Sequence, residues 1–147
     1  MNAEIFVALC DHLEKEVPEL RWIDEDGGQL NAHQNIRPAV DFPCCLIDIS
    51  YPDCRDTNET EQLVNATITI RLGFQSAGET NSKTPEPVRR RALERLSVIE
   101  KVQGAMQGWT ADDIISPVSR KSSQSSIMAN EVKVYTIVYK TTFLETQ

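Results

Sequence analysis

In the stretch QLVNATITIRLGFQ, residues 62–75, every second residue from Val64 to Phe74 is apolar. Side chains on a β-strand alternate between the two faces of the sheet, so this period predicts one long strand with one buried face. The polar face can contact water, a ligand or a neighbouring subunit, or it can line the lumen of an assembly. Water is the ordinary case for an antiparallel sheet. The polar face carries Asn65, Thr67, Thr69 and Arg71.

Two further segments have the pattern of strong strands. Residues 44–51 are followed by a polar turn over 52–61, which predicts an antiparallel pair with the 62–75 strand. Residues 131–144 are apolar on both faces, which is typical of a central strand covered on both sides. The chain has too few helical segments to cover two faces of a sheet, so either other subunits or a long loop must cover the second one. Weaker strands are predicted at 19–23 and 114–119.

Two amphipathic helices are predicted, over residues 2–17 and 86–107. The first stops before Pro18. The second begins with Thr84 as N-cap and Pro85 in the first turn. Its apolar stripe consists of Val88, Ala92, Leu96, Ile99, Val102, Gln103 and Met106. The segments 24–42, 76–84 and 120–130 are rich in Gly, Pro, Ser and Asn, and we predict them to be the least ordered parts of the chain.

These elements predict a single domain over residues 1–147. The predicted fold class is α+β, with a mixed, largely antiparallel sheet and the two main helices packed together on one of its faces. The predicted core residues are Leu9, Leu13, Ile68, Ile70, Leu72, Leu96, Ile99 and Val102.

Charge is divided unevenly along the chain. Residues 1–62 hold 14 acidic and 4 basic residues, and residues 63–147 hold 8 acidic and 11 basic ones, which together give the net charge of −7. Such a division is either surface decoration or suits a head-to-tail contact between copies. The basic half contains Arg89, Arg90, Arg91 and Arg95, a run that usually marks a solvated helix face. The overall acidity argues against a protein that wraps duplex DNA.

No pattern typical of an active site is present. No nucleophile is paired with a base, and no glycine-rich loop follows a strand, so we predict no enzyme, no catalytic residue and no cofactor. The four cysteines lack metal-ligand spacing, so we predict small buried thiols and no metal site. No apolar run approaches the ~20 residues of a membrane helix. The N-terminus also lacks the basic region of a secretory signal, so a cytosolic protein is expected.

The order of elements and four segments carry a family resemblance. The segments are RPAVDFPCCLIDI, NATITIRLGF, RRRALERLSVIEKVQGAMQGW and VKVYTIVYKTTF. The chain resembles, over nearly its whole length, the tail terminator and tail-completion proteins of tailed bacteriophages and prophages. The resemblance rests on the spacing of the elements and on the residue pattern within these segments. It assigns no functional residue of the family to a position in this chain.

The resemblance implies a structural virion protein that forms a homo-hexameric ring. Such a ring caps the tail tube, ends its polymerisation and presents the head-joining surface, first in the bacterial cytoplasm and then in the virion tail. Its partners would be the tail tube protein, a head-completion or neck protein, and passing DNA without sequence specificity. The candidate interface or lumen residues are Thr67, Thr69, Arg71, Arg89, Arg90, Arg91 and Arg95. The alternatives are a head-side neck or stopper protein and a small monomeric adaptor domain.

Overall fold

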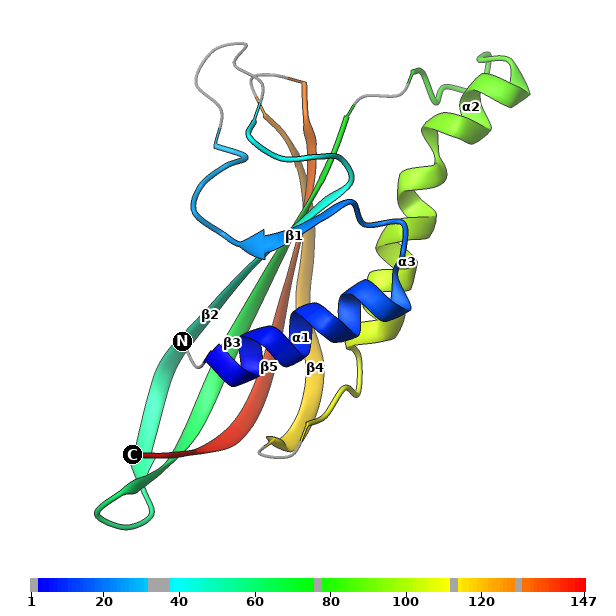
Figure 1. Ribbon diagram of the computed structural model, residues 1–147. Coiled ribbons are helices and arrows are strands. Elements are labelled where there is room, and N and C mark those ends of the chain that lie inside the picture. The colour runs from blue at the N-terminus through cyan, green and yellow to red at the C-terminus, as the bar shows by residue number, and fades with distance from the viewer. Residues whose placement is uncertain (1–2, 32–37, 76–77, 112–113, 129–130) are drawn as a thin grey trace.

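The computed structural model describes residues 3–31, 38–75, 78–111, 114–128 and 131–147, with residue 115 described by its backbone only. The predicted loops therefore lie partly outside the described residues, at 32–37, 76–77 and 129–130. The elements are α1 (Ala3–Glu16), β1 (Trp22–Glu25), β2 (Cys44–Asp56), β3 (Glu61–Phe74), α2 (Glu86–Ala92), α3 (Glu94–Met106), β4 (Ile114–Ile127) and β5 (Lys133–Thr146). Figure 1 shows long, twisted strands with α1 and α3 on one side of them.

The strands form one five-stranded sheet in the order β1-β2-β3-β5-β4. Strand β1 pairs parallel to β2, and every other neighbour is antiparallel. This is the predicted α+β fold with a mixed, largely antiparallel sheet. The predicted pairing of the second and third strands is confirmed, with Ile47 opposite Ile70. Strand β5 lies inside the sheet between β3 and β4, as its two apolar faces predict.

The main core lies between the sheet and the helices α1 and α3. The apolar residues of β3 from Val64 to Phe74 are all buried, which confirms the predicted face of that strand. The two helices also contact each other, because the His12 ring of α1 donates a hydrogen bond to the Ala105 carbonyl of α3 at 2.7 Å. The predicted core residues that are fully buried are Leu9, Leu13, Ile68, Ile70, Leu72 and Val102.

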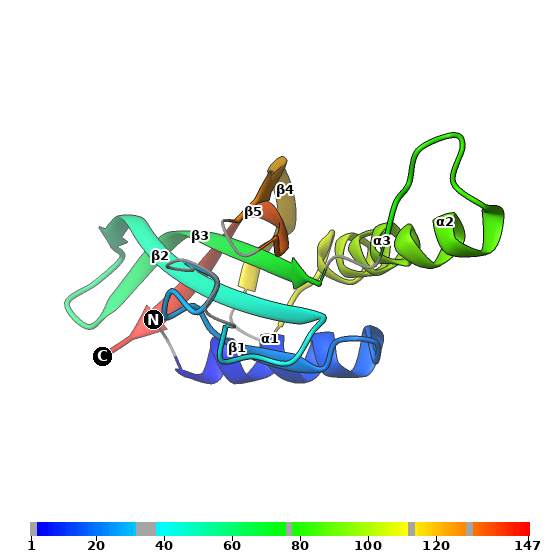
Figure 2. The same cartoon turned by 90° about the horizontal axis from the view of Figure 1, so that it is seen from above.

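The prediction for the second helix was wrong in two respects. The helix breaks at Leu93, whose φ of −88° and ψ of −4° separate α2 from α3. The buried residues of α3 are Val98, Val102 and Met106, so Val102 and Met106 are confirmed while Leu96, predicted as core, is 45% exposed. Ile99 is only partly buried, at the margin of the core. In Figures 1 and 2, α2 extends away from the sheet, and this leaves its apolar Val88 exposed.

The N-terminal cap of α2 also differs from the prediction. Pro85 is the N-cap residue, and no side chain makes a capping hydrogen bond there. The Thr84 hydroxyl is instead buried without a partner in the described structure.

A second, smaller core lies on the opposite face of the sheet, at the end where Gly73 and Cys44 pair. The segment between β1 and β2 covers this end, and it brings Leu30 and Val40 onto the strands. One of the two predicted alternatives, cover by a long loop, therefore holds for the start of β5: Leu30 and Val40 share this core with Val134 and with Val132 just before the strand.

Two strands are longer than predicted. Residues 52–56 were predicted as a turn but continue β2 beyond a bulge, with Asp53 opposite Asn65. Residues 120–127 were predicted as a flexible tip but belong to β4. Their Ser-rich sequence is tolerated because β5 supplies the backbone partners while the side chains stay exposed. The first weak strand lies at Trp22–Glu25, slightly after the predicted 19–23.

Candidate assembly surfaces

The polar face of β3 lies on the side of the sheet away from the helices. Asn65, Thr67, Thr69 and Arg71 are half-buried there, between β2 on one side and β5 on the other. They are partly shielded by their neighbours in the sheet rather than by a helix. The structure thus places three predicted site residues, Thr67, Thr69 and Arg71, in one row.

Hydrogen bonds between side chains connect this row to the adjacent strands. The Asn65 amide donates to Asp53 of β2 at 2.7 Å, and it accepts from the Thr142 hydroxyl of β5 at 2.9 Å. One step along, the Lys140 ammonium donates to the Thr67 hydroxyl at 2.6 Å. Cross-strand polar pairs of this kind stabilise a sheet and limit side-chain motion. The face is therefore an ordered polar surface across three strands.

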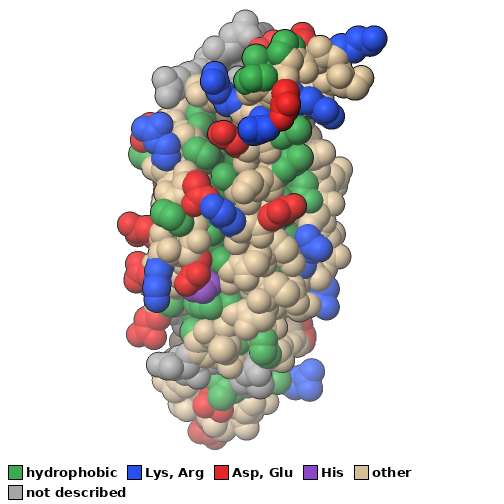
Figure 3. All heavy atoms as spheres, turned by 90° about the vertical axis from the view of Figure 1, so that its right-hand side faces the viewer, with side chains coloured by type: hydrophobic (Ala, Val, Ile, Leu, Met, Phe, Trp, Pro, Cys, Tyr) green, Lys and Arg blue, Asp and Glu red, His purple; other side chains and the backbone are tan. Residues whose placement is uncertain are grey.

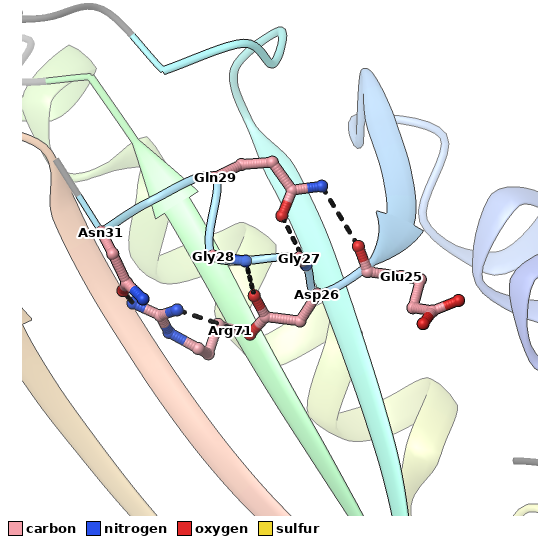
Figure 4. A network of polar contacts seen from close by, with 7 residues as sticks. All are labelled: Glu25, Asp26, Gly27, Gly28, Gln29, Asn31 and Arg71. Carbon is pink, nitrogen blue, oxygen red and sulfur yellow. Dashed lines mark hydrogen bonds and ion pairs between the residues drawn. The ribbon is translucent and has the colours of Figure 1, made fainter.

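Arg71 has a different role from the two threonines. Its guanidinium forms an ion pair with Asp26 at 3.4 Å and donates to the Asn31 side chain at 3.0 Å, as Figure 4 shows. The Asp26 carboxylate also accepts the backbone N–H of Gly28 at 3.0 Å, where a φ of +86° favours glycine. Arg71 thereby attaches the segment after β1 to the polar face. The Arg71 side chain is only 16% exposed, so its charge is paired mainly with Asp26 of the same chain.

The four predicted arginines lie elsewhere, on α2 and the start of α3. Arg89 donates to the Thr80 carbonyl at 3.0 Å, and Arg95 donates to the Ala92 carbonyl at 2.6 Å. Arg90 forms an exposed ion pair with Glu86 on the same helix. The structure does not bring these arginines together with the polar row of β3, so they form a second surface.

A trench beside that second surface was not predicted from the sequence. It lies between α3 and the ends of β3, β4 and β5 that face the top of Figure 1, and has a volume of about 580 Å³. Leu96, 45% exposed, and Ile127, 74% exposed, line it. Figure 3 faces this side of the molecule and shows hydrophobic side chains at the surface among charged ones. The one sequence signal was the isolated Ile127 after the serine run.

Burial sets the protonation of three of the four cysteine thiols. Burial raises the pKa of Cys10 and of Cys44 to about 11, and it raises the pKa of Cys45 further. These thiols therefore stay protonated, as small hydrophobes do. Cys54 is exposed on β2. No group of three potential metal ligands occurs among the described residues.

Comparison with protein-family profiles finds no family that matches the chain, and comparison with curated proteins finds no match either. Within the described residues, no helix is both long enough and apolar enough to cross a membrane.

Proposed function

We propose that this protein is a structural component of a phage or prophage tail, whose copies form a hexameric ring on the end of the tail tube. The ring would end polymerisation of the tube and present the surface that joins the head. The observation that supports this most is the helix-free polar face of the sheet. Its side chains are ordered by the bonds of Asn65, Thr67 and Arg71 to neighbouring elements.

An ordered polar face suits either the wall of a channel or a contact between subunits. It presents hydroxyls and amides, and its charges are of both signs, since Asp53 and Lys140 are both hydrogen-bonded on it. Because no single sign of charge dominates these contacts, DNA would pass such a wall without being held, and without sequence specificity. Thr67 and Thr69 are then lumen or interface residues, while Arg71 maintains the surface. The proposed partners are further copies of the chain, the tail tube protein and a head-completion protein.

The test is to interrupt this coding sequence in its own phage or prophage and to measure tails by electron microscopy. A terminator predicts tails of abnormal, mostly excessive length that lack heads, because nothing ends tube growth. Tails of normal length without heads would contradict the proposal and favour a neck or stopper protein. Normal particles would contradict it and favour an adaptor domain unrelated to the virion.

A further inference from the structure

The trench extends across the sheet beneath the junction of α2 and α3. The trench is lined by Leu96, Ile99, Ile127 and Tyr135 among others, and a second hollow adjoins it at Phe74 and Arg95. This second hollow continues to Phe42 and Pro43, just before β2. The ends of α2 and α3 that meet at Leu93 line this second hollow, through Arg91, Ala92 and Glu94. An apolar trench with exposed leucine and isoleucine side chains is typical of a docking site.

The charged residues around the trench are mostly cationic. Arg95 and Lys133 line the trench itself, and Arg91 and Glu94 line the adjoining hollow. None of these three cations forms an ion pair with another described residue of the chain. The trench therefore suits a segment that brings carboxylates with it.

The open edge of the sheet lies beside the trench. On the first half of β4, the Val118 N–H donates to the Trp109 carbonyl at 2.9 Å, and the Val118 carbonyl accepts the Gly108 N–H at 2.7 Å. This part of the edge is therefore already paired. On the second half, the Met128 N–H bonds the Val132 carbonyl at 2.9 Å. In an antiparallel pair, successive residues direct their backbone N–H and carbonyl groups alternately toward the partner strand and away from it. Since Met128 is directed toward β5, Ser123, Ser125 and Ile127 direct these groups away from β5, to the open side of β4. In the described part of the chain no backbone pairs with these groups, and such an edge accepts another strand.

One segment of the chain has the matching properties. The hairpin between β2 and β3, residues 52–61, holds four acidic residues and one basic residue. Residues 52–60 are all exposed, and none of the acids has an ion pair within the described structure. The hairpin projects beyond the helices at the bottom of Figure 1, at the opposite end of the molecule from α2. The pairing of β2 with β1 ends at Ile47, and among the described residues no strand lies beside the outer edge of β2 at residues 52–56.

We propose that the trench receives the acidic β2–β3 hairpin of a second copy of this chain. The carboxylates of Asp56 and Glu59 would meet Arg91, Arg95 and Lys133, and residues 52–56 of β2 would lie along the open edge of β4. The hairpin lies at one end of the molecule and the trench at the other, so their contact is heterologous. Repeated contacts of this kind close into a ring when the rotation between neighbouring copies divides a full turn. This inference rests on the proposed ring and names the surfaces that build it.

The exposed acids of α1 fit the trench less well. Glu4, Asp11 and Glu14 are exposed, but α1 lies along the sheet and does not project in Figures 1 and 2. For α1 to enter the trench of a second copy, the bodies of the two copies would have to occupy the same space.

The native thiol of Cys54 on the hairpin allows a direct test by cross-linking. We would introduce Ile127→Cys and, separately, Leu96→Cys, and oxidise each protein with diamide, alone and in the presence of its tail tubes. A disulfide needs Cβ atoms about 3.5–4.5 Å apart, so it forms only where the hairpin enters the trench. The hairpin and the trench lie at opposite ends of the molecule in Figure 1, so a link between Cys54 and an introduced trench cysteine joins two copies. We expect covalent oligomers from at least one variant.

Two controls separate this link from chance contacts. Adding Cys54→Ser should abolish the covalent oligomers, and Val7→Cys, 53% exposed on α1, should stay monomeric after oxidation. The inference is overturned if neither trench variant links to Cys54, or if Val7→Cys links equally well. Native mass and tube capping are measured on the same samples. Rings that cap tubes without the Cys54 link would overturn only the inference, whereas the link without capping would overturn only the proposed function.

Discussion

Leu30 packs directly on Gly73, so closely that a Cβ on Gly73 would lie 3.0 Å from the Leu30 Cδ2 atom. The same Cβ would lie 2.7 Å from the Cys44 Sγ atom. Leu30 and Cys44 are fully buried, so both side chains are surrounded by other protein atoms. This contact holds the segment after β1 on the polar face of the sheet, beside the Arg71 network.

Gly73→Ala should therefore destabilise the protein by about 1–3 kcal/mol, because the added methyl group overpacks a buried site. Urea unfolding followed by circular dichroism measures the change. The matched control is Gly104→Ala on α3, where a Cβ would meet nothing within 4 Å. That control should stabilise the helix by up to about 1 kcal/mol. Equal stability of Gly73→Ala and the wild type would contradict the packing of Leu30.

Removal of the Arg71 side chain should release the segment after β1. Arg71→Ala leaves Asp26, 13% exposed, without its ion pair, and we expect a loss of about 1–3 kcal/mol. Hydrogen exchange should also increase at residues 26–31. Arg90→Ala is the control, because its ion pair with Glu86 is highly exposed and contributes at most about 1 kcal/mol. If the two variants behave alike, Arg71 does not hold this segment in place.

Thiol reactivity should single out one cysteine. In the native protein at pH 8, iodoacetamide should label Cys54 and leave Cys10, Cys44 and Cys45 largely unmodified. Burial restricts access to these three, and their raised pKa values keep them protonated. Unfolding in guanidinium should expose all four thiols. Rapid native labelling of Cys45, read by peptide mass spectrometry, would contradict its buried position on β2.

Charge reversal at Arg90 and Arg91 of α2 should impair assembly and leave the fold intact. In Arg90→Glu/Arg91→Glu, the cation next to the trench becomes an anion and repels the acidic hairpin. Native mass and tube capping should both show weaker association, while the unfolding midpoint changes little. Association of the wild type should also weaken as salt rises, since the Debye length is roughly 8 Å at physiological ionic strength.

Lys15→Glu is the matched control for this reversal. Lys15 is an exposed cation in the last turn of α1, and it does not line the trench. Its reversal should leave association unchanged. Unchanged assembly of the double variant would remove charge pairing from the account.

The β3 strand and its buried face could be predicted because alternation is a local property of the sequence. The break at Leu93 could not, because Ala92-Leu93-Glu94 contains neither Gly nor Pro and reads as continuous helix. The trench was missed as well, because it is lined by residues that lie far apart in the sequence, on α3 and at the ends of β3, β4 and β5. The strand character of residues 120–127 was missed for another reason. Their polar side chains give no period, and only the pairing with β5 decides their conformation.

The central claim is that copies of this chain cap the tail tube. The most direct test is to mix the purified protein with polymerising tail tube protein of the same phage or prophage, and to image the product by cryo-electron microscopy. The account predicts tubes that stop growing, each with a six-fold ring of this protein at one end. Tubes that keep growing at both ends, with no added density at either, would contradict it.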